Sequence, residues 1–191
     1  MDINTSLINF FSSLGITQYF GVNGGGVIHF AKYLSVYAQD NSDPNYFYLS
    51  EYCAGFAPLG YYLTHKRPAA CLVTTGAAEK MVGAGLSDAR FMNLPCLYLM
   101  ALTPNSVSKH YPLQDTSING MNIIKQYQAE LGDAVIVINE KSNLMKALNE
   151  TKRILNSQHP VVVFFQPEVL STSSPIKLNR FIDASKEFKG I

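Results

Sequence analysis

The stretch Gln18-Tyr19-Phe20-Gly21-Val22, followed by Asn23-Gly24-Gly25-Gly26, sets the structural pattern of this chain. Its first five residues form a short, mostly apolar run that is typical of a buried strand, and the glycines after it favour a tight turn. A helix is then predicted over residues 27–37. The stretch therefore predicts a strand, a turn and a helix in immediate succession.

The same succession of strand and helix recurs along the chain. Apolar residues at helical spacing predict a helix that stops at Gly15, and they are Ile3, Leu7, Phe10, Phe11 and Leu14. Five more short apolar runs predict strands at residues 46–49, 70–74, 96–101, 134–138 and 161–165. Helices are expected at residues 52–64, 78–92 and near 119–127, and Ser142 is expected to cap a helix that reaches residue 155.

The last apolar run, Val161-Val162-Val163-Phe164-Phe165, is apolar on both faces, which is typical of a parallel strand covered by helices on each side. We therefore predict an α/β fold with a doubly wound, six-stranded, mostly parallel sheet and helices on both faces. The pattern fades after Phe165. The domain is thus expected to span residues 1–169, and residues 170–191 to form a linker or tail toward a following domain.

Composition excludes several classes of partner. The chain has 191 residues, of which 47% are apolar, so it can bury a full core as one domain. Its net charge is +1 and its basic residues are scattered, which argues against nucleic acid as a partner. No apolar stretch approaches the roughly 20 residues that span a bilayer, so no membrane segment is expected.

The first residues and the cysteines indicate the compartment. Met1-Asp2-Ile3-Asn4 is polar and acidic, unlike the basic and apolar regions of a secretory signal, so a cytoplasmic location is expected. Cys53, Cys71 and Cys96 form neither an even disulfide framework nor a CxxC pair. We expect all three to be reduced, buried packing residues.

Ligands of open parallel sheets bind beyond the carboxyl ends of the strands. That rule selects Asn23–Gly26, Ser50-Glu51, Thr74–Ala78 and the loop at residues 102–118. Only Glu51 is an acid immediately after a strand. An acid at this position can also do no more than interact with the helix dipole, which is worth about 0.3–1 kcal/mol.

The glycine loop allows two interpretations that the residues alone leave open. Asn23–Gly26 is either a plain turn from strand to helix or a place where a flat ring approaches the backbone closely. It is not a dinucleotide fingerprint, because His29 occupies the position of the last glycine of G-x-G-x-x-G. A nicotinamide cofactor is therefore not expected.

Seven segments match, in order and spacing, the pattern of one known domain. They are Gly15–Val22 with its glycines, Glu51–Ala57, Cys71–Gly76, Gly85–Pro95, Leu113-Gln114-Asp115, Lys125 and Pro160–Pro167. These segments resemble the N-terminal, pyrimidine-binding domain of thiamine diphosphate enzymes of the acetolactate synthase and pyruvate decarboxylase superfamily. The family writes the second segment H-E-x-x-A-x-x-A and the third V-T-S-G-P-G-A-T-N. Here Ala77-Ala78 replaces Pro-Gly, and Glu79-Lys80-Met81 replaces Ala-Thr-Asn.

The resemblance implies specific roles for residues of this chain. It implies that Glu51 is the carboxylate beside ring atom N1′ of thiamine diphosphate and assists removal of the proton at C2. It implies that the cofactor-binding residues are Asn23, Gly24, Gly25, Glu51, Thr75, Gly76 and Gln114. No metal ligand is expected in this chain, because Mg²⁺ is held in this family by a second domain with a G-D-G motif. Gly132-Asp133-Ala134 is interpreted as a turn that enters a strand.

The implied activity is that of a lyase or transferase that decarboxylates 2-oxo acids or joins them to a second substrate, as acetolactate synthase does. The chain is expected to be inactive alone, to pair with the diphosphate-binding domain of another chain, and to form a homo-oligomer. The altered segment Thr75–Met81, in which Glu79 can simply favour a helix start, motivates an alternative: a non-catalytic assembly or regulatory module. A further alternative is an unrelated flavodoxin-like protein that binds a flavin or nucleotide.

Overall fold

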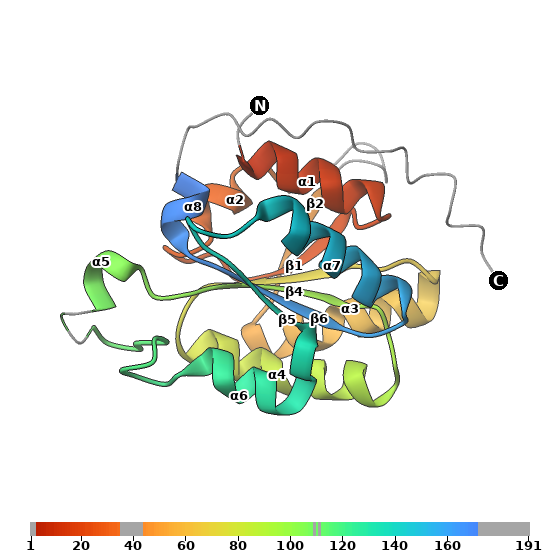
Figure 1. The fold of residues 1–191 in the computed structure, drawn as a ribbon. Helices are drawn as coiled ribbons and strands as arrows, with labels where there is room; N and C mark the ends of the chain where they lie inside the picture. Colours follow the sequence, from red (N-terminus) through yellow and green to blue (C-terminus); the bar gives the residue numbers. More distant parts are fainter. Residues whose placement is uncertain (1–2, 35–43, 109, 111, 172–191) are drawn as a thin grey trace.

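The computed structural model describes residues 3–34, 44–108, 110 and 112–171. Helices and strands alternate along the described chain (Figure 1). Their bounds are α1 Ile3–Ser13, β1 Gln18–Gly21, α2 Ile28–Ala31, β2 Asn45–Tyr48, α3 Glu51–His65, β3 Ala70–Val73, α4 Ala77–Phe91, β4 Leu97–Ala101, α5 Asn105–Ser108, α6 Ile123–Leu131, η1 Gly132–Ala134, β5 Val135–Ile138, α7 Leu144–Asn156, β6 Val161–Phe165 and α8 Pro167–Ser171. The predicted α/β class is confirmed.

All six strands form one sheet in the order β2-β1-β3-β4-β6-β5. Every pairing is parallel, so the predicted mostly parallel sheet is parallel throughout. The chain moves outward from β1 to β2, and then returns to place β3 on the other side of β1. This reversal between β1 and β3 is the topological switch point of a doubly wound sheet.

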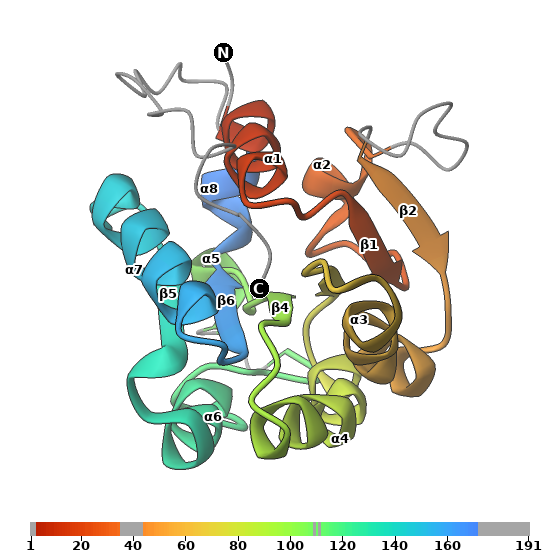
Figure 2. The ribbon, with the colours of Figure 1, turned by 90° about the vertical axis from the view of Figure 1, so that its right-hand side faces the viewer.

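Helices cover both faces of the sheet, as predicted. Figures 1 and 2 show α1, α2, α7 and α8 on one face and α3, α4 and α6 on the other. Val161, Val163 and Phe165 of β6 pack under the first group, and Val162 and Phe164 pack under the second. All five side chains are buried, which explains why this strand is apolar at every position.

The helix expected near residues 119–127 begins later and ends later, at Ile123 and Leu131. The segment before it closes into a turn around Asp115. Its carboxylate accepts the Ser117 amide at 2.9 Å, and its carbonyl oxygen accepts the Met121 amide at 2.7 Å. These bonds satisfy the backbone in a non-helical path, so the helix starts only after them.

The predicted cap of α7 is wrong by one residue. Asn143 is the N-cap, and its side-chain oxygen accepts the amide of Lys146 at 3.0 Å. The hydroxyl of Ser142 accepts the amide of Asn139 at 2.9 Å instead, so it belongs to the turn before the helix. Capping requires an acceptor at the residue directly before the first turn, with its partner three residues on.

The expectation for one cysteine needs correction, and parts of two other expectations fall outside the described residues. Cys71 and Cys96 are buried as expected, but Cys53 is exposed on α3, so the prediction was wrong for that cysteine. The boundary expected at 169 falls inside α8, which is tied to α1 by a 2.8 Å bond from Asn4 Nδ2 to the Leu170 carbonyl oxygen. Residues 172–191 of the expected tail and residues 35–37 of the expected helix lie outside the described residues.

In the described part of the chain, no helix is both long and apolar enough to cross a membrane.

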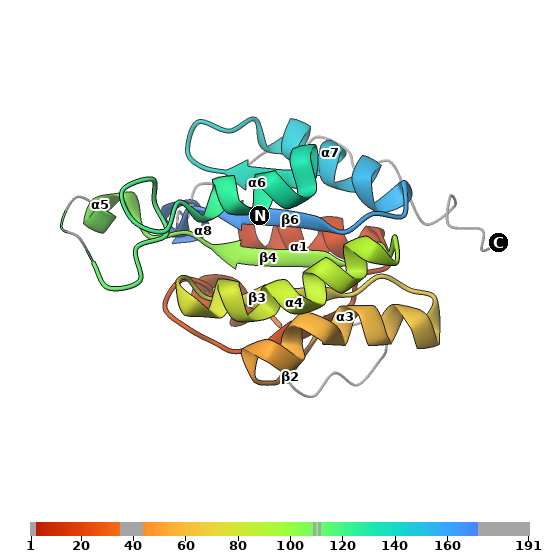
Figure 3. The same cartoon turned by 90° about the horizontal axis from the view of Figure 1, so that it is seen from below.

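Helices α3 and α4 pack unusually closely, and Figure 3 shows them side by side under the sheet. A Cβ atom at Gly85 of α4 would lie 2.1 Å from the carbonyl carbon and oxygen of Gly55 on α3. This approach fixes α3 against α4 about one turn after Glu51. By contrast, a Cβ atom at Gly60 of α3 would meet nothing within 4 Å.

We expect Gly85→Ala to lower the free energy of unfolding by about 1–3 kcal/mol, because the two backbones must separate to admit the methyl group. Urea unfolding followed by circular dichroism measures this loss. Gly60→Ala is the matched control, and it should be neutral or stabilising by up to about 1 kcal/mol. Equal stability of the two variants would show that the helices are not in close backbone contact.

Candidate functional site

The carboxyl ends of β2, β1, β3 and β4 lie next to one another at one edge of the sheet. Figure 3 shows this edge on the left, where the segment with α5 extends from the end of β4. The segments that follow these strands are Ser50-Glu51, Asn23–Gly26, Thr74–Gly76 and Leu102-Thr103. All the predicted site segments therefore share the edge, with the switch point between β1 and β3 at its centre.

Glu51 is the first residue of α3 and follows β2 by two positions. Its side chain is half-buried. The neighbouring Ser50 is the N-cap, but its hydroxyl makes no capping bond. Within the described residues, the Glu51 carboxylate makes no hydrogen bond or ion pair, so both of its oxygens are available to a ligand.

Asn23 connects the ends of β1 and β2. Its Nδ2 atom donates to the hydroxyl of Tyr48 at 3.1 Å. Its Oδ1 atom is buried and has no hydrogen-bond partner among the described residues. A buried acceptor without a donor is costly, so this oxygen fits a ligand that carries an N–H group.

The glycines of the loop divide between the two interpretations that the sequence left open. Gly26 packs against β4, because a Cβ atom there would lie 2.6 Å from the Cβ of Ala101. A Cβ atom at Gly24 would lie 2.5 Å from the side chain of Thr74. A Cβ atom at Gly25 would meet nothing within 4 Å. Packing therefore requires Gly24 and Gly26, whereas Gly25 leaves bare backbone that a flat ring can approach.

We expect Gly26→Ala to lower the free energy of unfolding by about 1–3 kcal/mol, because Ala101 is buried in the sheet and cannot move aside. Gly25→Ala is the matched control and should change stability by no more than about 0.5 kcal/mol. Thermal unfolding of both variants checks the contrast. A loss of similar size in Gly25→Ala would mean that this glycine is also needed for folding.

The segment Thr75-Gly76-Ala77 is held by side chains from both sides. Gly76 has φ +95° and ψ −134°, a backbone conformation that only glycine adopts easily. Its amide donates to Glu79 Oε2 at 3.1 Å, and the amide of Ala77 donates to Gln114 Oε1 at 3.0 Å. The structure thus brings the predicted residues Thr75, Gly76 and Gln114 together.

Two threonines that the sequence did not single out anchor the long loop to this edge. The amide of Thr103 donates to Thr116 Oγ1 at 2.8 Å, and the amide of Thr116 donates to Thr103 Oγ1 at 2.9 Å. Both hydroxyls lie 3.4 Å or less from another threonine hydroxyl, and that of Thr75 completes the group. No sequence pattern marks such a reciprocal pair, because its members are 13 residues apart.

Glu79 lies three residues after Gly76 and satisfies the amide of that residue, as expected of an acid at a helix start. The burial of its side chain was not expected, since its exposed fraction is 0%. Burial raises the pKa of the Glu79 carboxyl to about 8, against the opposing effects of the Gly76 amide and Lys80. Its Oε1 atom has no partner among the described residues. The spacing Gly76-x-x-Glu79 was the only local signal for this residue.

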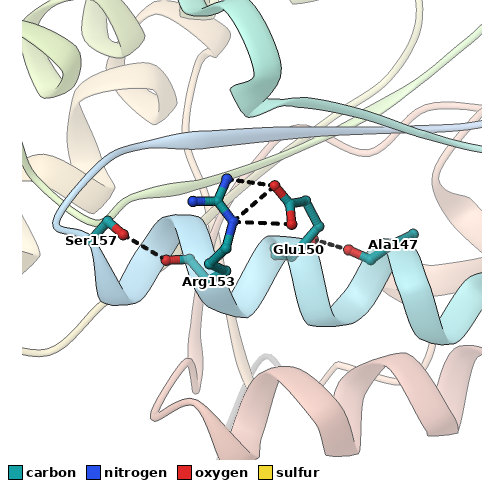
Figure 4. A network of polar contacts seen from close by, with 5 residues as sticks. Ala147, Glu150, Arg153 and Ser157 are labelled. Atoms are coloured by element: carbon teal, nitrogen blue, oxygen red, sulfur yellow. Dashed lines mark hydrogen bonds and ion pairs between the residues drawn. The ribbon is translucent and has the colours of Figure 1, made fainter.

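A cavity of about 560 Å³ opens at the opposite, amino edge of the sheet and contains none of the predicted site residues. Its lining includes Gly132-Asp133-Ala134, which is the short helix η1 directly before β5, as the predicted turn required. It also includes Arg153 of α7, whose guanidinium Nε and Nη2 donate to Glu150 at 2.5–3.1 Å (Figure 4). An exposed pair of this kind stabilises the helix only slightly.

The described residues contain no group of three or more His, Cys, Asp or Glu side chains that could hold a metal ion. The family model described as "Thiamine pyrophosphate enzyme, N-terminal TPP binding domain" matches residues 1–123. The matched part runs from α1 to the start of α6 and includes every predicted site residue. A search of the curated proteins finds no match to the chain.

This protein is thus an α/β domain, with a parallel sheet, of the class that binds the pyrimidine of thiamine diphosphate. The chain belongs to the N-terminal domain family of the thiamine pyrophosphate enzymes. The expected resemblance is confirmed, and the alternative of an unrelated flavodoxin-like protein is wrong. The sheet also differs from the flavodoxin order, because β6 lies between β4 and β5.

Proposed function

We propose that this chain supplies the pyrimidine-binding half of an enzyme that decarboxylates or joins 2-oxo acids, and that Glu51 activates its thiamine diphosphate. This is the acetolactate synthase-like lyase or transferase chemistry that the sequence motifs favour. The observation that carries the proposal is the Glu51 carboxylate, which is half-buried at the carboxyl edge and makes no hydrogen bond or ion pair within the described residues.

The residues of the edge fit an aminopyrimidine ring. The unpartnered Oδ1 of Asn23 is an acceptor suited to the amino group of the ring. The bare backbone at Gly25 allows a flat ring to approach, beside Gly24. Glu51 would meet ring atom N1′, and Thr75, Gly76 and Gln114 would form the facing wall. These residues bind and orient the pyrimidine end of the cofactor.

Glu51 has one chemical task in this proposal, which is to hold and move a proton at N1′. When bound, the cofactor would supply an acidic C2 carbon that, once its proton is removed, can add to the carbonyl of a 2-oxo acid. The carboxyl of Glu51 would share its proton with N1′ and so control, through the conjugated ring, the basicity of the amino group on the far side of that ring. Positioned proton transfer of this kind contributes about 10²- to 10⁴-fold to a rate.

The diphosphate and its Mg²⁺ are proposed to be held by the diphosphate-binding domain of another chain, in a homo-oligomer. Large apolar side chains exposed in the amino-terminal halves of α3 and α4 support an interface next to Glu51, and they are Tyr52 and Met81. Tyr52 is 55% exposed. Exposed apolar groups that gather on one side of a protein commonly mark contacts with another protein.

We expect Glu51→Gln in the assembled enzyme to lower turnover by about 10²- to 10⁴-fold while cofactor binding survives, because glutamine keeps the shape but cannot transfer the proton. Exchange of the C2 proton of the cofactor, followed by NMR, should slow in parallel. Glu140→Gln, on an exposed turn before α7, is the matched control and should leave both rates unchanged.

The outcome also decides between the two functions considered. A folded Glu51→Gln enzyme with the C2 exchange and turnover of the wild type would contradict the role of Glu51. It would favour the alternative of a non-catalytic assembly or regulatory module, in which the edge residues keep the fold but do no chemistry.

The chain alone should bind thiamine diphosphate with Mg²⁺ no more tightly than about 1 μM, because it is proposed to contact only the pyrimidine end. Isothermal titration calorimetry measures this affinity directly. Submicromolar binding by the chain alone would mean that it also holds the diphosphate, and the shared site would have to be abandoned.

A further inference from the structure

A fully buried carboxyl group lies directly under one wall of the proposed cofactor site. Glu79, in the first turn of α4, has an exposed fraction of 0%. Its Oε2 accepts the amide of Gly76 at 3.1 Å, and its Oε1 has no partner among the described residues. Acids are rarely buried in this way without a structural or functional use.

The wall meant here is the backbone of Thr75 and Gly76. Two hydrogen bonds from backbone amides to side chains hold it, because its backbone path is unusual. Gly76 has a positive φ of 95°, and a side chain there would collide with Gln114, whose Oε1 would lie 2.0 Å from the new Cβ atom. Successive amides, of Gly76 and Ala77, donate to Glu79 and Gln114. Glu79 holds the wall from α4, and Gln114 holds it from the long loop.

Glu79 is itself fixed from the opposite side. The hydroxyl of Tyr127 on α6 donates to the carbonyl oxygen of Glu79. The ring of Tyr127 in turn packs on Phe164 of β6, with centroids 5.8 Å apart. The first turn of α4 is thereby held to the core, so the bond from Glu79 attaches Gly76 to the core and not to the long loop.

We propose that Glu79 is a positioning residue, whose carboxyl holds the Gly76 amide and so fixes the wall Thr75–Gly76 against which the pyrimidine lies. The inference rests on the proposed function in one respect, namely that this wall belongs to the cofactor site. The family pattern has alanine at this position, so the bond from Glu79 is a feature of this chain and not of the motif.

The carboxyl performs this role in its uncharged form at neutral pH. Burial raises the pKa of Glu79 to about 8, and the ionisable groups that interact with it are Lys80 on the same helix and Tyr127 on α6. The pKa of this acid in the folded chain exceeds its ordinary value of 4.5. The folded state therefore keeps the proton longer than the unfolded state does, and stability falls as pH rises from about 4.5 through about 8.

The first test uses this chain alone, with Glu79→Gln and Glu79→Ala. Glutamine is neutral and keeps an oxygen that can accept the Gly76 amide, whereas alanine removes it. By NMR at pH 6, we expect the Gly76 amide to exchange with solvent at least about tenfold faster in Glu79→Ala, and at the wild-type rate in Glu79→Gln. Unfolding by urea should lose stability between pH 5 and about 8 in the wild type, and this loss should be absent in Glu79→Gln.

The second test measures positioning in the assembled enzyme. We expect Glu79→Ala to raise the Kd for thiamine diphosphate about tenfold per folded site, and Glu79→Gln to restore it at pH 6–7. A merely structural acid would lower the unfolding temperature without changing this Kd. A Gly76 amide equally protected in Glu79→Ala, or an unchanged cofactor Kd in that variant, would overturn the inference.

The two proposals fail in different ways. If Glu51→Gln leaves C2 exchange unchanged, the proposed function is lost, while Gly76 exchange in the chain alone still decides whether Glu79 holds the wall. If Glu51→Gln slows C2 exchange and Glu79→Ala leaves the cofactor Kd unchanged, the function stands and only the positioning role of Glu79 is wrong.

Discussion

Parallel pairing of β2, β1, β3 and β4 is the constraint on which the site depends. It directs the carboxyl ends of four strands to one edge, although the segments that follow them are separated by long stretches of chain. The reversal between β1 and β3 places two glycine-containing segments, Asn23–Gly26 and Thr74–Gly76, side by side there. Glu51 follows the outer strand β2, so it lies at an edge that the pairing of the strands defines.

Bonds between side chains and backbone then make this edge rigid. Asn23 joins the ends of β2 and β1, and the amide of Gly26 joins the loop to Thr74 after β3 at 3.3 Å. The threonine group and Gln114 extend the series to the long loop. Glu51 and the Oδ1 atom of Asn23, by contrast, have no partner among the described residues. Under the proposed function, an edge braced in this way favours orientation of one bound ring.

The sequence predicted what depends on local patterns, and it failed where distant residues decide. The strand Val161–Phe165 was predicted to the residue, because a five-residue apolar run between Pro160 and Gln166 has no other plausible location than the centre of a covered sheet. The start of α6 was missed, because it depends on a turn around Asp115 that closes onto Met121. The location of Glu51 directly after a strand was predicted correctly, whereas its role stays a prediction. The burial of Glu79 was not predicted, because it arises from packing of α4 and α6 on the sheet.

The altered segment after β3 is internally consistent, which bears on whether it still supports catalysis. The family pattern has proline where Ala77 stands, and proline fixes its own φ but offers no amide hydrogen. Here Ala77 has that hydrogen and donates it to Gln114, while Glu79, in place of alanine, accepts the amide of Gly76. These two hydrogen bonds therefore restrain the backbone here, where the pyrrolidine ring of proline restrains it in the family pattern. Because the altered residues compensate for one another, loss of the Pro-Gly motif does not by itself imply loss of an ordered wall. This segment motivated the alternative of a non-catalytic module, and under the proposed function its two hydrogen bonds meet the positional requirement that the Pro-Gly motif meets in the family pattern.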